Sequence, residues 1–376
     1  MKLVVLGGDD SVLLEGTRAR ARMIEYSHLF DELHIVVAAR EGAGTRREGN
    51  LITYPAASRG FLGRMLRVLK VGDSVCRSAR PDVISAENAD IFGLIGYVLS
   101  KRYEIPLQVQ VHADIFSPHY RSASWKETAR YALAAFVLPR ADCLRVVSQR
   151  VAEGAAHRLG IPKSRIRVLP IHTDVAEHRT APRDHAVDAR FREYGFRMVS
   201  TGRFVDREKR FSLLIDVMAD IRREIPRAVL VLVGDGPDRR RYEQAIKSRG
   251  LEDTVRLEPW RHDLPSFLKS FDVFLQASNY EGWGRACVEA AAAGLPVITT
   301  DVGLAGELLI DGVSALVVPV GDREAMSRAV VRLYSNPQER RGLARAAGEA
   351  VDRLPFRSMN DYYRAYRGAV EACLKR

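Results

Sequence analysis

Glu281 and Glu289 flank a glycine-rich turn that leads into the alanine-rich run Ala290–Ala293. Gly282 and Gly284 let the backbone pass close to a ligand, and the free N–H groups at the start of the next helix would face it. A diphosphate suits such a helix start. The two carboxylates would lie up to about 12 Å apart along the helix, which predicts two contacts to one elongated ligand. The alternative is that Glu281 caps the helix and Glu289 is solvated.

Two basic residues, Arg203 and Lys209, follow the apolar run Met198–Ser200. Fixed cations at such a place could stabilise the negative charge of a bound diphosphate. Most Arg and Lys side chains only solvate a surface, but the position after a predicted strand favours a role in phosphate binding. The sequence contains no Asp-x-Asp, the usual metal–diphosphate clamp. We therefore expect metal-independent chemistry without a cofactor.

The first half of the chain contains two candidate site residues, His112 and Gly8. His112 follows the apolar run Leu107–Val111 and is either a buried structural residue or part of a site. Gly8 lies in the turn Gly7–Asp9, which lacks a Gly-x-Gly-x-x-Gly pattern and a Walker lysine. This difference disfavours binding of a dinucleotide or of ATP.

Short apolar, β-branched runs alternate with stretches of helical periodicity along the chain. This alternation predicts parallel sheets covered by helices on both faces, which is a doubly wound α/β fold. Ligands bind beyond the carboxyl ends of such strands, where the residues above are placed. The runs are Leu3–Leu6, His34–Ala38, Val83–Ser85, Leu107–Val111, Cys143–Val147, Met198–Ser200, Val229–Val233, Val255–Leu257, Val273–Gln276 and Val297–Thr300.

The length of 376 residues corresponds to about two domains. Between residues 174 and 196 the regular pattern lapses into His, Arg, Asp, Ala and Pro. We predict an N-terminal Rossmann-like domain over residues 1–175, a linker over 176–196 and a C-terminal Rossmann-like domain over 197–355. A final helix over 356–376 would pack back on the first domain. Two such domains facing each other would enclose a cleft for a nucleotide-bearing substrate.

The segment 278–297 resembles the Glu-x7-Glu signature of retaining GT-B glycosyltransferases, specifically glycosyltransferase family 4. That signature is usually written Ser, Glu-Gly-Phe-Gly, Glu-Ala and Gly-Pro-Val, and Trp283 replaces its Phe. Residues 201–209 resemble the family's Gly-Arg…Lys element, although Arg210 stands where Gly is usual. Residues 233–237 resemble its Gly-x-Gly-Pro strand end. The resemblance is strong over about 140–320 and weaker over 1–140.

This resemblance implies that the donor nucleotide binds the second domain and the acceptor the first. Glu289 would bind the ribose, and Glu281 would bind the sugar hydroxyls together with the turn that follows it. Arg203 and Lys209 would bind the diphosphate. We expect the leaving phosphate to help deprotonate the acceptor on the same face of the sugar.

The same resemblance places His112 near the donor sugar or phosphate, Gly8 near phosphate and acceptor, and the base near Glu258–Arg261. The implied catalytic residues are His112, Glu281, Arg203 and Lys209. The implied donor-binding residues are Gly8, Gly202, Gly234, Trp260, Gly282, Trp283, Gly284, Arg285 and Glu289.

The net charge of +11 and the pI near 9.6 permit nucleic acid, an anionic membrane or phosphorylated small molecules as partners. No apolar run approaches the roughly 20 residues of a membrane helix, and the first residues do not form a secretory signal. The cysteines Cys76, Cys143, Cys287 and Cys373 are scattered without a CxxC or zinc spacing. A reducing cytoplasm is therefore expected.

The segment Arg59–Val71 has an apolar face opposite Arg64, Arg67 and Lys70 at about 100° per residue. It is either a helix packed on the sheet or a peripheral contact with anionic lipid, where lipid-linked acceptors are anchored. The second interpretation would place the protein at the inner face of the membrane.

The leading interpretation is a retaining hexosyltransferase of cell-envelope polysaccharide biosynthesis. It would move sugar from a nucleotide-sugar donor, with UDP favoured over GDP, to a glycan, lipid-linked or small-molecule acceptor. Two alternatives use other chemistry: a glycoside phosphorylase or sugar-nucleotide epimerase on the same fold, and a basic nucleic-acid-binding protein. The last lacks a helix-turn-helix, zinc or RNA-binding motif, so we expect no nucleic-acid partner.

Overall fold

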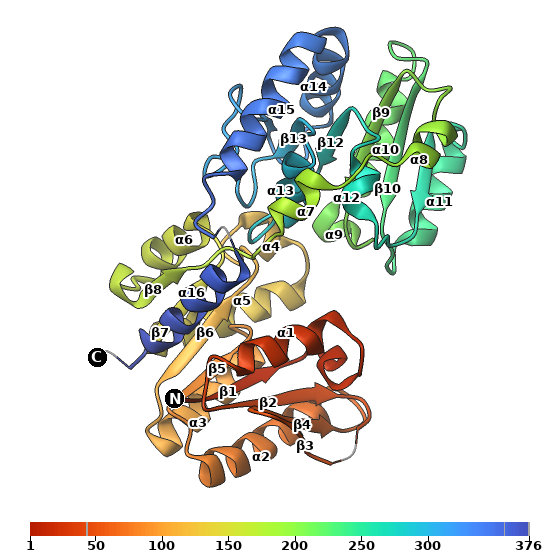
Figure 1. The fold of residues 1–376 in the computed structure, drawn as a ribbon. Coiled ribbons are helices and arrows are strands. Elements are labelled where there is room, and N and C mark those ends of the chain that lie inside the picture. The colour runs from red at the N-terminus through yellow and green to blue at the C-terminus, as the bar shows by residue number, and fades with distance from the viewer. Residues whose placement is uncertain (43, 357, 375–376) are drawn as a thin grey trace. The chain divides into compact units, whose positions relative to one another are not determined.

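The computed structural model describes residues 1–42, 44–356 and 358–374, and it divides into two compact units (Figure 1). Unit 1 consists of Met1–Pro170 together with Ser358–Arg376, and unit 2 consists of Ile171–Arg357. The two parallel α/β sheets of the prediction are confirmed. Within the described residues, no helix is both long enough and apolar enough to cross a membrane.

The sheet of unit 1 has eight strands among the described residues, in the order β3-β4-β2-β1-β5-β6-β7-β8. All neighbours pair in parallel except β3 and β4. The central strands are buried along almost their whole length, as expected for a sheet with helices on both faces. The strands are β1 (Lys2–Gly7), β2 (Glu32–Ala39), β3 (Arg46–Glu48), β4 (Leu51–Ala57), β5 (Val83–Ala86), β6 (Leu107–Val111), β7 (Cys143–Val146) and β8 (Ile166–Val168).

Hydroxyl side chains begin several helices of unit 1. Thr17, Ser124 and Ser148 accept hydrogen bonds from backbone N–H groups of the first helical turn, which satisfies donors that lack a partner inside the helix. The helices are α1 (Arg18–Ser27), α2 (Phe61–Ala79), α3 (Ile91–Tyr103), α4 (Pro118–Ser122), α5 (Trp125–Val137), α6 (Gln149–Leu159) and α16 (Met359–Glu371).

The C-terminal helix α16 belongs to unit 1 and lies beside β6 and β7 (Figure 1). A capping box between Ser358 and Asp361 starts it. Its buried face includes Tyr366, whose ring stacks on Tyr26 of α1 with centroids 4.5 Å apart. The amide of Gln108 on β6 donates to the Ala369 carbonyl over 2.8 Å. The helix therefore completes the cover of the sheet that the first 170 residues build.

The sheet of unit 2 has six strands among the described residues, all paired in parallel in the order β11-β10-β9-β12-β13-β14. The strands are β9 (Phe196–Thr201), β10 (Ala228–Val233), β11 (Val255–Glu258), β12 (Val273–Gln276), β13 (Val297–Thr300) and β14 (Leu316–Val318). The helices are α7 (Val175–Thr180), α8 (His185–Arg190), α9 (Asp206–Lys209), α10 (Phe211–Ile221), α11 (Arg239–Ser248), α12 (Leu264–Leu268), α13 (Arg285–Ala292), α14 (Arg323–Ser335) and α15 (Pro337–Val351).

An aromatic cluster fixes the chain just beyond β9. Phe204, Phe211 and Tyr242 are almost fully buried, and their rings meet edge to face with centroids 5.3–5.9 Å apart. Edge-to-face pairs are a favourable arrangement of aromatic rings. The cluster holds α9 and the start of α10 over the end of the sheet, which is where Lys209 lies.

Each of the ten predicted apolar runs overlaps a strand. The strands β3, β4, β8 and β14 are not among them. β3 is polar and exposed, and β8 and β14 span only three residues each. β4 contains Pro55, a residue that argues against a strand. The predicted linker 176–196 differs from the structure. Most of it forms α7 and α8, and the whole segment belongs to unit 2. Asp174 and Asp184 start these helices by accepting backbone hydrogen bonds, a signal that the irregular composition concealed.

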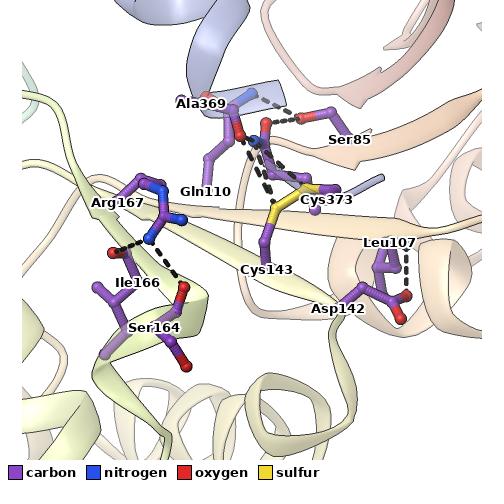
Figure 2. Close-up of a disulfide and its surroundings, with 11 residues drawn as sticks. Ser85, Leu107, Gln110, Asp142, Cys143, Ser164, Ile166, Arg167, Ala369 and Cys373 are labelled. Carbon is purple, nitrogen blue, oxygen red and sulfur yellow. Dashed lines mark hydrogen bonds between the residues drawn. A yellow bond between two sulfur atoms is a disulfide. The ribbon is translucent and has the colours of Figure 1, made fainter. Parts of the chain in front are cut away.

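The cysteines differ from the expectation of scattered, reduced thiols. Figure 2 shows a disulfide between Cys143 of β7 and Cys373, which follows α16. Their Cα atoms lie 5.2 Å apart although 230 positions separate them in the sequence, and this Cα separation suits a disulfide. The spacing of cysteines in the sequence gave no sign of it, because the fold alone brings α16 onto the sheet. Cys76 and Cys287 are free and buried.

We predict that reduction of this disulfide destabilises the protein by about 2–4 kcal/mol, because the cross-link restricts the unfolded chain over a long loop. Urea unfolding with and without a phosphine reductant measures the difference. Cys373→Ser should unfold like the reduced protein and ignore the reductant, whereas Cys76→Ser should keep the response. An air-oxidised wild-type chain whose intact mass still includes the thiol hydrogens of Cys143 and Cys373 would contradict the pairing.

Candidate functional site

The carboxyl ends of three neighbouring strands bring the candidate residues of unit 2 together. β9 lies between β10 and β12, so the loops after Thr201, Val233 and Gln276 share one edge of the sheet. Backbone hydrogen bonds tie these loops to each other, from Gly202 N to Val233 O over 3.0 Å and from Asn279 N to Glu208 O over 2.8 Å. The edge therefore forms a single framework.

Lys209 and Glu281 form an ion pair at this edge. Their side chains are only 20% and 12% exposed, so little water screens the pair. Ser278 Oγ donates to the same Glu281 oxygen over 2.8 Å and helps to orient the carboxylate. The lysine is the cation expected for phosphate binding, and in this structure a carboxylate from the adjacent loop neutralises it.

Glu289 lies on α13, one turn beyond Arg285. Arg285 Nε lies 3.0 Å from Glu289 Oε1, and the arginine side chain is 57% exposed whereas that of Glu289 is 12% exposed. Gly284 precedes the helix with φ 95° and has no side chain to cap it. The start of α13 can therefore offer backbone N–H groups and the positive end of the helix dipole to an anion. Neither Glu281 nor Glu289 caps this helix.

Gly202 and Gly234 allow the loops after β9 and β10 to pass each other closely. Gly234 has φ 153°, and a Cβ atom there would lie 1.9 Å from the Gly202 carbonyl oxygen. A side chain is therefore excluded at this position. Arg203, which directly follows Gly202, pairs with Glu208 over 2.7 Å, and its side chain is 66% exposed. Arg203 can therefore turn toward a ligand without leaving a buried cavity.

The two candidate tryptophans lie in opposite environments. Trp260 follows β11 and is 52% exposed, whereas Trp283 is only 3% exposed. Buried Trp283 packs within unit 2, and its indole N–H has no hydrogen-bond partner among the described residues. Near Trp260, Glu258 pairs with Arg190 over 2.5 Å. Trp260 thus presents an aromatic surface, while the contribution of Trp283 to a ligand site is limited to its backbone.

Cys287 lies on α13, near the carboxylates of Glu281 and Glu289. Its thiol is of a type that can act as a nucleophile. Burial raises the pKa of its thiol, and the charge of Glu281 raises it further. The thiol therefore stays protonated at neutral pH and is no candidate nucleophile.

In unit 1, His112 lies at the carboxyl end of β6 and lines a cavity of about 50 Å³. Its Nε2 is 3.1 Å from Gln110 Oε1, which also accepts from Arg145 over 2.6 Å. Arg145 in turn donates to the Tyr362 hydroxyl of α16 over 2.7 Å. Burial lowers the pKa of His112 to about 3, helped by the charge of Arg145. The ring is therefore neutral near pH 7 and donates from Nε2.

Gly8 lies at the same edge, after β1. A Cβ atom at Gly8 would lie 3.3 Å from the Phe92 ring, and one at Gly7 would lie 2.0 Å from Glu87 Oε2. Gly7 thus makes room for the carboxyl of Glu87, which follows β5. Burial raises the pKa of Glu87 and the charge of Asp9 raises it further, while a backbone hydrogen bond from Gly8 opposes both. A carboxyl group that keeps its proton to a higher pH than usual therefore lies beside Gly8.

The structure thus brings Lys209, Glu281, Glu289 and Arg203 to one edge of unit 2. His112 and Gly8 lie at the corresponding edge of unit 1. Four further residues at these edges are not among the predicted site residues: Glu87, Arg145, Ser278 and Asn279. Three of them carried a signal. Ser278 and Asn279 come just after the predicted strand Val273–Gln276. Glu87 likewise follows the run Val83–Ser85, whereas Arg145 sits inside a strand and gave none.

Two family models match the chain. The model described as "Glycosyl transferases group 1" matches residues 186–350, and the model described as "Glycosyl transferase 4-like domain" matches residues 17–172. The matched segments lie in unit 2 and unit 1, respectively, except for residues 171 and 172.

Similar proteins include two from Rhizobium meliloti that are named lipopolysaccharide core biosynthesis glycosyltransferases. LpsD is 31% identical over 198 residues, which cover 52% of this chain and 56% of LpsD. LpsE is 32% identical over 154 residues, which cover 41% of this chain and 44% of LpsE. The chain thus spans about half the length of these relatives. The crystal structure of Anabaena HepE in complex with UDP-glucose has the same fold, with a TM-score of 0.76, 20% identity and 100% of both chains covered.

We predict that His112 makes the protein less stable in acid. The unfolded histidine takes up a proton below its ordinary pKa of 6.5, while the folded ring stays neutral until about pH 3. Unfolding is therefore coupled to proton uptake, and stability falls as the pH falls through this window, by at most about 1.4 kcal/mol per pH unit.

Urea unfolding of wild type and His112→Gln between about pH 7 and pH 4 measures the effect, because the variant lacks this proton uptake. Its stability should depend less on pH. The exposed His157 supplies the control, His157→Gln, which should follow the wild-type curve. Parallel curves for wild type and His112→Gln would contradict the prediction.

Proposed function

Because the chain belongs to the group 1 glycosyltransferases, we propose that it transfers a sugar from a nucleotide-sugar donor to a glycan, lipid-linked or small-molecule acceptor. The observation that carries the proposal is the meeting of Lys209, Glu281 and the start of α13 at one sheet edge. A cation, a carboxylate and a helix N-terminus there match the diphosphate and sugar of one donor molecule.

Donor binding on this proposal exchanges partners within existing ion pairs. The diphosphate replaces Glu281 as the partner of Lys209, and Glu281 becomes free to accept hydrogen bonds from sugar hydroxyls. In the same way Glu289 turns from Arg285 to the ribose. Arg203, which is largely exposed, swings from Glu208 to the phosphate. After these exchanges Lys209 is paired with phosphate and the two carboxylates accept hydrogen bonds from hydroxyls, which limits the cost of desolvating the charges.

The base would lie on the exposed ring of Trp260, near Arg261 and Glu258. We propose UDP rather than GDP as the nucleotide. The HepE structures support this choice, since their titles name UDP, UDP with glucose, and UDP-glucose as ligands. They have the same fold as this chain.

We propose that the reaction retains the anomeric configuration and needs no metal. Arg203, Lys209 and the start of α13 would stabilise the charge on the leaving diphosphate, the task that a metal performs where an Asp-x-Asp clamp exists. The leaving phosphate would take the proton of the acceptor hydroxyl. His112 is neutral, and its Nε2–H is held by Gln110, so its Nδ1 would accept a hydrogen bond from a hydroxyl of the donor sugar without a change of charge.

The names of LpsD and LpsE support a role in cell-envelope polysaccharide synthesis. We place that role in the cytoplasm, where nucleotide sugars are the donors. A reducing environment there would keep Cys143 and Cys373 as thiols, so the disulfide would form only on oxidation.

We also propose that α2 binds anionic lipid. Met65 and Val68 are buried against unit 1, but Phe61, Leu62 and Leu66 are 58%, 70% and 53% exposed. The neighbouring side chains on the solvent side are basic and exposed: Arg59, Arg67 and Lys70. An apolar stripe bordered by cations matches a negatively charged membrane surface and brings the protein to a lipid-linked acceptor.

The donor site is tested by titrating the protein with UDP-, GDP- and ADP-sugars in a calorimeter. We expect binding of UDP-glucose, and we expect Lys209→Met to weaken it about tenfold or more, since it removes a charged hydrogen bond to phosphate. Lys247→Met, an exposed lysine on α11, is the control and should bind as wild type. Failure of all these nucleotide sugars to bind would refute the proposal.

The membrane contact is tested by sedimentation with phosphatidylglycerol and phosphatidylcholine vesicles. We expect binding to the anionic vesicles alone, and a loss of about fivefold for each of Arg67→Gln and Lys70→Gln. Leu62→Ser should also weaken binding, whereas Val313→Ser, which changes an exposed apolar residue of unit 2, should not. Equal binding of wild type to both lipids, or none, would exclude an electrostatic contact.

A further inference from the structure

Arg210 adopts a backbone conformation that is unfavourable for residues other than glycine. Its φ and ψ are 48° and 45°, in the left-handed region that favours glycine, and it stands between α9 and α10. The group 1 pattern usually has glycine at this position, directly after the phosphate-binding lysine. A non-glycine residue in this region carries backbone strain that the surrounding structure has to offset.

The side chain of Arg210 reaches the neighbouring loop of the donor site. Its Nη1 donates to Asn279 Oδ1 over 3.1 Å. Asn279 in turn donates from Nδ2 to the Arg207 carbonyl over 3.0 Å and from its backbone N to the Glu208 carbonyl over 2.8 Å. Asn279 is therefore held from one side by the backbone of α9 and from the other by Arg210.

These bonds join the two segments that carry the Lys209–Glu281 pair. Lys209 ends α9 immediately before Arg210, and Glu281 lies two residues after Asn279. Ser278, on the other side of Asn279, donates to the Glu281 carboxylate. The position of Asn279 thus sets where the turn 278–281 places Glu281 relative to Lys209.

The guanidinium also packs against a third loop. A Cβ atom at Gly321, which follows β14, would lie 2.8 Å from Arg210 Nη1. The glycine leaves room for the arginine, which is partly buried as a result. Arg210 is therefore confined by neighbouring groups, and its fork is held toward Asn279.

We propose that Arg210 is a positioning residue for the sugar end of the donor. It acts through Asn279 and holds Glu281 at the distance from Lys209 at which one group can bind the sugar and the other the phosphate. The proposal rests on the donor-binding function proposed above and deepens it. It predicts that Arg210 affects recognition of the sugar while leaving recognition of the nucleotide almost unchanged, because the side chains of Arg203, Lys209 and Glu289 pair with Glu208, Glu281 and Arg285 rather than with Asn279.

The experiment compares the affinities of wild type and Arg210→Gly for UDP-glucose and for UDP alone, by calorimetry on the full chain. Glycine suits the left-handed backbone, so the variant keeps the turn while losing the guanidinium. We expect about tenfold weaker binding of UDP-glucose and a change below about twofold for UDP. Arg210→Lys, which can donate one hydrogen bond to Asn279, should recover part of the loss. Equal losses for both ligands would overturn the proposal.

Two controls separate positioning from backbone strain. Arg80 is an exposed residue of unit 1 with φ 47°, so Arg80→Gly relieves the same kind of strain far along the chain from the donor loops. It should leave both affinities unchanged. Asn279→Ala should reproduce the Arg210→Gly loss, and the double variant should lose no more than either single one, because both act through one contact.

If neither UDP nor UDP-glucose binds, that result counts against the proposed donor. The role of Arg210 can then be tested by a measurement without ligand. Glu281→Gln removes the carboxylate that pairs with Lys209 and should lower the melting temperature. If Arg210 positions Glu281, that loss should shrink in the Arg210→Gly background. Fully additive losses would show that Arg210 does not act on Glu281.

Discussion

Parallel strand pairing is the constraint on which both units depend. A parallel neighbour requires the chain to return along the outside of the sheet, so each strand is followed by a loop at the same edge and then by a helix. Loops that are distant in the sequence therefore meet at one edge. In unit 2 this rule brings residues 201–209, 233–237 and 276–285 together. In unit 1 it places Gly8, Glu87 and His112 after β1, β5 and β6, which are adjacent strands.

This rule explains how much the sequence predicts. An apolar strand is recognisable from a few consecutive residues, and the candidate residues follow such strands, so the fold class and the positions of Lys209, Glu281 and Glu289 could be predicted. Short or polar strands such as β3 and β14 are hidden, since they lack enough buried residues to show a pattern. The helices α7 and α8 were missed because single capping residues start them, within a composition typical of loops.

Pairing between distant side chains could not be predicted. The partner of Lys209 depends on the exact turn that carries Glu281, and that turn depends on Asn279 and Arg210. The contact from Arg145 to Tyr362 and the pairing of Cys143 with Cys373 both depend on where α16 docks. None of these contacts has a local signature, because each joins segments that only the complete unit brings together. The same holds for the pKa of His112, which burial and Arg145 set jointly.

The ion pairs of unit 2 allow several cations to lie close together without destabilising the protein, as a site for a diphosphate requires. Cations gathered at one edge without partners would repel each other and lose hydration as the sheet packs. Here three of these cations are matched by carboxylates: Lys209 by Glu281, Arg203 by Glu208, and Arg285 by Glu289. On the proposed function, two of these carboxylates, Glu281 and Glu289, bind hydroxyls of the donor once its phosphates take the cations. Glu281 and Glu289 would thereby stabilise the folded protein before the donor binds and recognise the donor afterwards. This double role explains why both carboxylates are largely buried although a ligand can break their ion pairs.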